Sequence, residues 1–265
     1  MPATTLLIGI FVVLLGLAFG SFLNVCIARL PRRESIVRPP SHCPLCGTAI
    51  RASNNIPLLS YALLRGRCRA CKGSISWRYP AVEFATASLW LACFLQFGAT
   101  LQAAAMAVLC FLALGLAAMD AETLLLPDAF TVPGILLGVL WSAVSTDGAW
   151  LDRLRAAGMS LLWATAAAAI ILLIRTSYWL VRRREGMGLG DAKLFAMFAA
   201  WLGPANSLLI FFLAVIAGAA YGVLIMRGRR GGSARLPLGS FLCLAAIYAI
   251  FAGPQTIAWY LRFYR

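Results

Sequence analysis

Two aspartates stand where a carboxylate meets a long apolar segment, a position in which an acid can do chemistry. Asp191 follows a glycine-rich run that holds Gly188 and Gly190, and Asp120 directly follows the apolar run 111–119. Because glycine has no side chain, these glycines leave room for backbone or substrate to approach Asp191. Two carboxylates at the ends of membrane helices can share a proton and activate a water molecule for hydrolysis. The alternative is that both acids are hydrated helix ends, which the spacing alone leaves open.

Two further charged residues accompany this pair. Asp128 follows a proline and precedes an apolar segment, so we expect it to cap the next helix. Lys193 comes two residues after Asp191 and therefore points to another face of its helix, where we expect it to anchor the helix at the membrane interface. The glycine run lacks the Gly-Lys-Ser/Thr ending of a phosphate loop, which argues against nucleotide binding. We therefore treat Asp120 and Asp191 as the candidate catalytic pair, with Gly188, Gly190, Asp128 and Lys193 as supporting residues.

Four cysteines form two CxxC pairs separated by a polar stretch. They are Cys43, Cys46, Cys68 and Cys71. Thiolates at this spacing can bind one tetrahedral zinc ion, and a closed four-cysteine site is structural because it has no open position for water. Gly47 and Gly73 follow the two pairs, where a tight turn needs positive φ. Two disulfides or four free thiols are the alternatives, and disulfides are disfavoured if the segment is cytoplasmic. We expect His42, the only histidine, to lie beside the metal site rather than to bind the ion.

The composition is that of an integral membrane protein. Of the 265 residues 62% are hydrophobic and 12% are charged, whereas soluble domains carry about a quarter charged residues. The net charge of +14 is compatible with nucleic acid or with anionic lipid as a partner. The basic residues avoid the apolar runs and gather between them, which favours membrane lipids and argues against nucleic acid.

These elements predict an all-α polytopic membrane protein of about eight membrane helices with a small zinc-ribbon-like cytoplasmic insert. Residues 5–23 form the first uncharged run, which is long enough to span a membrane. The other expected helices are 80–97, 100–119, 129–146, 156–180, 191–203, 205–226 and 237–261. The segment 191–203 is too short to span alone unless it is extended or joined to the next helix across Gly203-Pro204.

We divide the chain into three parts by composition. Residues 1–28 contain the first membrane helix, 29–79 the four-cysteine insert, and 80–265 the helical membrane core. The insert holds ten basic residues and one acid, Glu34, and it lacks the apolar pattern of a self-supporting core. If the N-terminus lies outside the cytoplasm and the helices alternate, 18 basic residues fall on the cytoplasmic side and four outside. Both termini are then periplasmic, while the insert, Asp120 and Asp191 are cytoplasmic.

Several motifs, in order along most of the chain, resemble those of the prepilin peptidases, also called type IV leader peptidases. They are Gly20-Ser-Phe-Leu-Asn-Val-Cys-Ile-Ala-Arg-Leu-Pro31, the double CxxC with Asn55-Ile-Pro57, Arg78-Tyr-Pro-Ala-Val-Glu83, Asp120 with Leu126-Pro-Asp128, and Gly188-Leu-Gly-Asp-Ala-Lys193. Together these motifs are far more specific than any one of them.

The resemblance implies a membrane aspartic endopeptidase of the bacterial inner membrane. It would remove the short basic leader from prepilins or pseudopilins, the substrates of type IV pilus and type II secretion systems, at the cytoplasmic membrane face. Asp120 and Asp191 would be the catalytic pair. The resemblance also implies N-methylation of the new N-terminus with S-adenosylmethionine, whose binding residues the sequence leaves unknown. A proton-coupled transporter, whose acids usually lie at mid-membrane, and a non-catalytic zinc-bearing assembly scaffold remain as alternatives.

Overall fold

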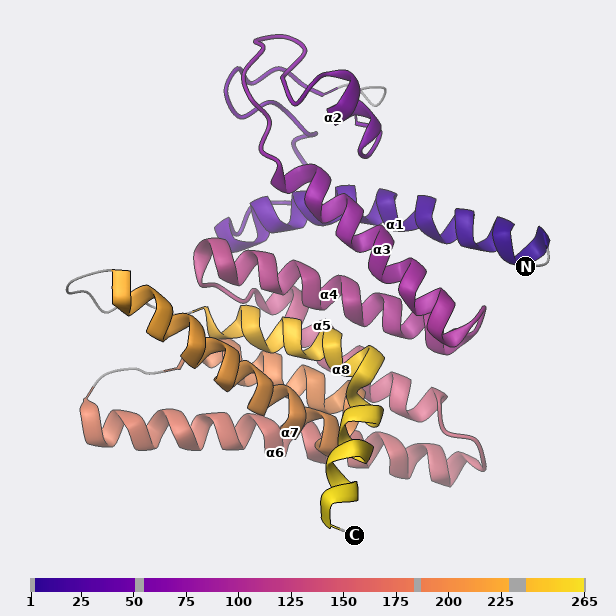
Figure 1. The fold of residues 1–265 in the computed structure, drawn as a ribbon, viewed down its shortest axis with the longest axis vertical. Coiled ribbons are helices and arrows are strands. Elements are labelled where there is room, and N and C mark those ends of the chain that lie inside the picture. Colours follow the sequence, from indigo (N-terminus) through magenta and orange to yellow (C-terminus); the bar gives the residue numbers. More distant parts are fainter. Residues whose placement is uncertain (1–2, 51–54, 184–186, 229–236, 265) are drawn as a thin grey trace. The chain divides into compact units, whose positions relative to one another are not determined.

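The structure is a computed structural model that describes residues 3–50, 55–183, 187–228 and 237–264 (Figure 1). The described residues are almost entirely helical, and their only β pairing consists of two isolated bridges in the insert. The helices are α1 Ala3–Arg29, α2 Leu59–Leu63, α3 Arg78–Phe97, α4 Leu101–Thr123, α5 Asp128–Val144, α6 Trp150–Arg182, α7 Leu189–Gly228 and α8 Leu238–Leu261, with short 3-10 turns at Leu30–Arg32 and Arg262–Tyr264. The all-helical fold class predicted from the sequence is confirmed.

Six of the described helices are long and apolar enough to cross a membrane. They are α1, α3, α4, α6, α7 and α8, whereas α5 is a shorter apolar helix. The helix α7 is interrupted at Gly203, whose φ of 73° and ψ of 179° are not helical. Its two halves correspond to the expected segments 191–203 and 205–226, so every expected apolar segment is present as a helix.

The break in α7 has a local chemical cause. Pro204 has no N–H group, so the carbonyl of Ala200 cannot receive a helical hydrogen bond from residue 204. The hydroxyl of Ser160 on α6 donates to this carbonyl instead, at 2.9 Å. The side chain of Trp201 donates from Nε1 to the Gly134 carbonyl of α5 at 2.8 Å. The break therefore accepts a hydrogen bond from α6 and donates one to α5.

The chain divides into two compact units, Met1–Gly115 and Leu116–Arg265, and the division falls within α4. In the first unit, two glycines of α1 let α3 approach closely. A Cβ atom on Gly16 would lie 2.7 Å from Cα of Ala87, and one on Gly20 would lie 2.7 Å from Cα of Glu83. One turn further along α1, Asn24 donates from Nδ2 to the carbonyl of Tyr79 at 3.0 Å. Small residues thus set the α1–α3 contact, as is common between membrane helices.

In the second unit, the first half of α7 is the central helix. Residues 194–201 are all buried, as expected for a helix that is apolar on every side. Ala196 and Ala200 pack with Ala164 of α6 and with Ile135 and Val139 of α5. This central position fixes Asp191, which lies in the first turn of α7.

Candidate active site and metal centre

Asp120 is buried near the end of α4, and its carboxylate receives two hydrogen bonds from one residue. Ser240, in the first turn of α8, donates from its backbone N–H to Oδ2 at 2.6 Å and from its hydroxyl to the same oxygen at 3.0 Å. Asp120 is only 5% exposed. The expected helix ended at residue 119, whereas α4 continues to Thr123, where Leu124 takes a φ of 55°. Asp120 therefore lies inside the last turns of α4, facing the N-terminus of α8.

Asp191 stabilises the start of its own helix. Its Oδ2 accepts a hydrogen bond from the backbone N–H of Gly188 at 2.9 Å. This is the bond by which an acidic side chain in the first turn satisfies a free N–H at a helix N-terminus. The side chain is half-buried, in contrast to the buried Asp120.

The two candidate catalytic carboxylates lie near each other in the second unit. Gly190, next to Asp191, and Gly239, beside Asp120, both face the side chain of Leu126, so the two carboxylates lie around the same leucine, near enough for an electrostatic interaction. Helices α4, α7 and α8 therefore converge here. A pair of carboxylates in this arrangement can activate water between them.

Leu126 occupies the glycine-lined space beside the pair. A Cβ atom on Gly190 would lie 3.0 Å from Cβ of Leu126, and one on Gly239 would lie 3.0 Å from Cδ1 of the same leucine. The Gly239 Cβ would also lie 3.0 Å from Cγ and Oδ2 of Asp120. Gly190 thus makes room for Leu126, whereas the sequence analysis expected open space there. Gly188 contributes its N–H to Asp191.

Asp128 and Lys193 form an ion pair, which corrects two expectations. The Lys193 Nζ lies 2.6 Å from Oδ1 of Asp128. Pro127 is the N-cap of α5 and no side chain caps it, so Asp128 is the first residue of the helix and not its cap. Lys193 was expected to be an interfacial anchor, but the long side chain reaches across to α5. The pair joins the beginning of α5 to the beginning of α7.

In the first unit, Glu83 holds the beginning of α2 against α3. Its Oε2 accepts a hydrogen bond from the backbone N–H of Leu58 at 2.8 Å, and its carboxylate also receives one from the side chain of Ser21. Leu58 has a φ of 58°, which is rare for a leucine. The buried carboxylate therefore stabilises a strained backbone position at the membrane end of the insert.

The four predicted cysteines come together in the insert. The ligand atoms of Cys43, Cys46, Cys68 and Cys71 all lie within 4.8 Å of one another, and no disulfide links them. The Sγ atoms of Cys43 and Cys71 are 3.9 Å apart. Zn–S bonds of about 2.3 Å in a tetrahedron place sulfur atoms about 3.8 Å apart, so the arrangement fits a metal ion.

The two CxxC pairs have the same backbone geometry. The N–H of Gly47 donates to the carbonyl of Cys43 at 2.8 Å, and the N–H of Lys72 donates to that of Cys68 at 3.0 Å. In both turns the residue after the second cysteine has positive φ, 70° for Gly47 and 59° for Lys72. The sequence analysis assigned the second of these positions to Gly73. That glycine instead faces Leu45, whose side-chain end a Cβ at this position would displace.

One thiol of the cluster is stabilised in its ionised form, and the neighbouring histidine lies outside the cluster. Hydrogen bonds from the side chain and backbone of Thr48 lower the pKa of the Cys46 thiol to about 6, which favours the thiolate that binds metal. His42 is outside the group of four sulfur atoms, and its ring lies 3.1 Å from the Pro40 carbonyl. This agrees with its expected place beside the site.

Sequence reasoning missed Leu126, Gly239 and Ser240 as parts of the aspartate site. Gly239 and Ser240 follow Pro237 at the start of a long apolar segment. This pattern predicts where a helix begins, but it does not predict which other helix the first turn contacts. Nothing local connects Ser240 to an aspartate 120 positions earlier. The contact depends on how α4 and α8 pack.

Fold and site define a multi-pass membrane protein with a cysteine cluster that could hold a metal ion and two neighbouring aspartates. The bacterial peptidase A24 N-terminal domain matches residues 14–97, and the type IV leader peptidase family matches residues 106–223. The chain belongs to the type IV leader peptidase family, which are peptidases of the aspartic type.

Three relatives carry the name prepilin leader peptidase/N-methyltransferase. The protein of Pseudomonas aeruginosa is 37% identical over 95% of this chain and 92% of its own length. That of Pseudomonas putida is 36% identical over 92% of this chain and 90% of its own. That of Myxococcus xanthus is 40% identical over 85% of this chain and 66% of its own. No solved structure is significantly similar to the chain.

Proposed function

We propose that this protein removes the basic leader from prepilins or pseudopilins at the cytoplasmic face of the inner membrane and methylates the new N-terminus. Asp120 and Asp191 are the catalytic pair in this proposal. The observation that carries it is the placement of these two carboxylates around Leu126, with Asp120 on α4 beside Gly239 and Asp191 on α7 next to Gly190. Family membership and the names of the relatives support the substrate class and the two activities.

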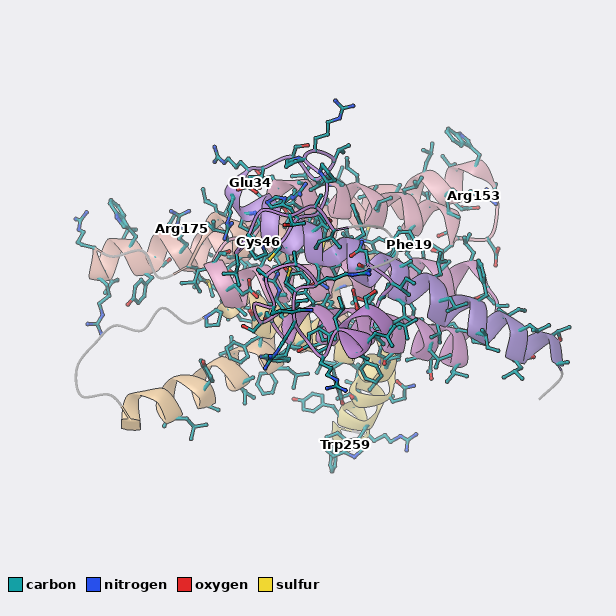
Figure 2. All side chains as sticks on the ribbon, turned by 90° about the horizontal axis from the view of Figure 1, so that it is seen from above. Phe19, Glu34, Cys46, Arg153, Arg175 and Trp259 are labelled. Atoms are coloured by element: carbon teal, nitrogen blue, oxygen red, sulfur yellow. The ribbon has the colours of Figure 1, made fainter. Side chains whose placement is uncertain are left out.

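The distribution of basic residues supports a cytoplasmic site. Figure 2 shows Arg153 toward one end of α6 and Arg175 toward the other. Arg175 shares its end of the helix with Arg182 and Arg183, the end that leads into α7 and Asp191. The more basic side of a membrane protein faces the cytoplasm. In this orientation both termini are periplasmic, whereas the insert and the aspartates are cytoplasmic. Six arginines that are also counted in the charge bias lie outside the described residues: Arg51, Arg184, Arg229, Arg230, Arg235 and Arg265.

Hydrogen-bond donors suggest which aspartate carries the negative charge. Oδ2 of Asp120 accepts from two donors of Ser240, whereas Oδ2 of Asp191 accepts from one, the N–H of Gly188. Hydrogen bonds donated to a carboxylate favour its ionised form, so the carboxylate with more donors is the better base. The helix-start position of Asp191 predicts the opposite, an ionised Asp191, but on the hydrogen bonds we assign the shared proton to Asp191, in a pair that titrates as a unit.

The mechanism is a general acid–base hydrolysis. Asp120 takes one proton from a water molecule, whose oxygen bonds to the scissile carbonyl carbon while Asp191 gives its proton to the carbonyl oxygen. The resulting diol collapses: Asp120 gives its proton to the leaving nitrogen, the C–N bond breaks, and Asp191 recovers a proton from one hydroxyl. Leader carboxylate and mature amine are released with both aspartates in their starting states.

The cysteine cluster has a structural role in this proposal. Cys43, Cys46, Cys68 and Cys71 would bind zinc in a closed site, because four thiolates fill its tetrahedral coordination and leave no position for water. The ion would tie the insert together, where apolar packing is sparse. S-adenosylmethionine would supply the methyl group for the second activity. We assign no residues to this cofactor.

The test is cleavage of a purified prepilin by the full chain in detergent or liposomes. Asp120→Asn and Asp191→Asn should each abolish the shortened product while the protein still inserts in the membrane. Mass spectrometry of the wild-type product should show the leader loss and an added methyl group. Retained cleavage in both variants would disprove the aspartate pair. A wild-type protein that leaves the prepilin intact would favour a transporter or an assembly scaffold.

A further inference from the structure

Ser240 contacts Asp120 with every donor it has. Its N–H lies 2.6 Å and its hydroxyl oxygen 3.0 Å from Oδ2, while Oδ1 of Asp120 has no hydrogen-bond partner among the described residues. Ser240 is 9% exposed and Asp120 is 5% exposed, so water competes little for these bonds. One oxygen of the carboxylate is thereby fixed on α8, and the other is left for the reaction.

The Ser240 hydroxyl has a second acceptor within reach. Its Oγ lies 2.9 Å from the carbonyl of Ala117, one turn before Asp120 on α4. A hydroxyl has one proton and can serve only one of these acceptors at a time. The Ala117 carbonyl lies inside α4, where the helix supplies its own donor, so it tolerates either position of the hydroxyl.

Close packing keeps this arrangement in place. A Cβ on Gly239 would lie 3.0 Å from Cγ and Oδ2 of Asp120, so a side chain at this position would press on the carboxylate. Because Gly239 has no side chain, the first turn of α8 can approach α4. The backbone N–H of Ser240 can then reach Oδ2.

We propose that Ser240 is a positioning residue of the peptidase site, whose N–H and hydroxyl hold Oδ2 of Asp120 so that Oδ1 accepts the proton of the attacking water. The hydroxyl donates to Oδ2 while Asp120 is ionised, and it turns to the Ala117 carbonyl when Oδ1 has taken the proton. The covalent bonds of Ser240 stay intact, and only its hydrogen bonds change. This inference rests on the proposed function, in which Asp120 is the base.

The test compares Ser240→Ala with Ser207→Ala in the cleavage assay. Ser207 is a matched control, because its buried hydroxyl donates to the Gly203 carbonyl at 2.7 Å within the same unit, at the break in α7. Ser240→Ala keeps the backbone N–H and removes only the hydroxyl. We expect kcat to fall about 10-fold or more, as for a lost hydrogen bond to a charged group, with KM unchanged. Ser207→Ala should keep the wild-type kcat.

Two further measurements separate positioning from stability. The melting temperatures of the two alanine variants should be similar, and Ser240→Thr, which keeps the hydroxyl, should recover most of the lost kcat. An unchanged kcat in Ser240→Ala overturns the inference, as does a loss of kcat that merely follows a lower melting temperature. Asp120→Asn is measured in parallel. Activity in that variant refutes the proposed function itself, whereas an inactive Asp120→Asn beside a fully active Ser240→Ala refutes only the role of Ser240.

Discussion

The ammonium of Lys193 lies 2.6 Å from the carboxylate of Asp128, and this ion pair joins the beginning of α5, the helix after that of Asp120, to the beginning of α7, which holds Asp191. Asp128 begins α5, directly after the loop that follows Asp120, and Lys193 is two residues after Asp191. The side chain of Asp128 is 65% exposed and that of Lys193 is 40% exposed, so the pair is solvated. Its role is therefore to align two chain segments more than to stabilise the fold.

If the ion pair aligns the two segments, removing the charge of Lys193 should lower peptidase activity slightly, and reversing that charge should lower it more. Because exposed ion pairs contribute at most about 1 kcal/mol, Lys193→Ala should lower peptidase activity less than about 10-fold. Lys193→Glu should lower it further, since it would place two carboxylates together. The double variant Asp128→Lys with Lys193→Glu should recover activity above that of Lys193→Glu alone. A double variant as inactive as the single reversal would show that the pair does not align the segments.

The contacts of Leu126 predict that a substitution of this leucine restores the activity lost by a substitution of Gly190. Gly190→Ala should press a methyl group on Leu126 and lower activity, as overpacking typically costs about 1–3 kcal/mol. Leu126→Ala in the same chain should restore much of that loss. Gly239→Ala should lose activity as well, but Leu126→Ala should not rescue it, because the new Cβ still meets Asp120. Cleavage rates of the four variants measure this difference, and equal rescue of both glycine variants would contradict it.

The α1–α3 contact predicts a stability effect far from the aspartates along the chain. Gly20→Val should destabilise the first unit by about 1–3 kcal/mol or more, because its Cβ would lie 2.7 Å from the backbone of Glu83. Gly9→Ala, on the same helix, is the control. A Cβ at that position meets only the ring of Phe94, at 3.6 Å, so stability should stay within about 0.5 kcal/mol. Thermal unfolding in detergent distinguishes the two, and equal melting temperatures would exclude tight packing at Gly20.

The cysteine cluster predicts a local response to metal removal. Native protein should contain one zinc ion per chain, and a chelator or Cys43→Ser should remove it. Hydrogen exchange should then rise in residues 39–50 and 55–76 and stay unchanged in α4 to α8. Cys26→Ala, which alters a buried cysteine outside the cluster, should retain the ion. Native protein that contains no metal by elemental analysis would refute the site.

The sequence by itself determined the helical membrane class, the metal-ligand set and the candidate aspartates. Hydrophobic runs and CxxC spacing are local patterns, and a helix or a paired-cysteine turn forms largely from neighbouring residues. The same locality explains the errors at Asp128 and Gly73. Both assignments placed a residue by its distance along the chain from a helix start or a cysteine pair. In the structure the neighbouring residue has the expected role: Pro127 is the N-cap of α5, and Lys72 has the positive φ.

Only the tertiary structure decided what surrounds those aspartates. Three contacts around the aspartates join different helices or loops. Ser240 donates hydrogen bonds to Asp120, and Lys193 forms an ion pair with Asp128. Leu126 packs between Gly190 and Gly239. Sequence patterns carry little information on such contacts, because they depend on which faces of apolar helices meet. In α7, the pattern is apolar on every side, so packing alone selected the orientation that places Asp191 near Asp120.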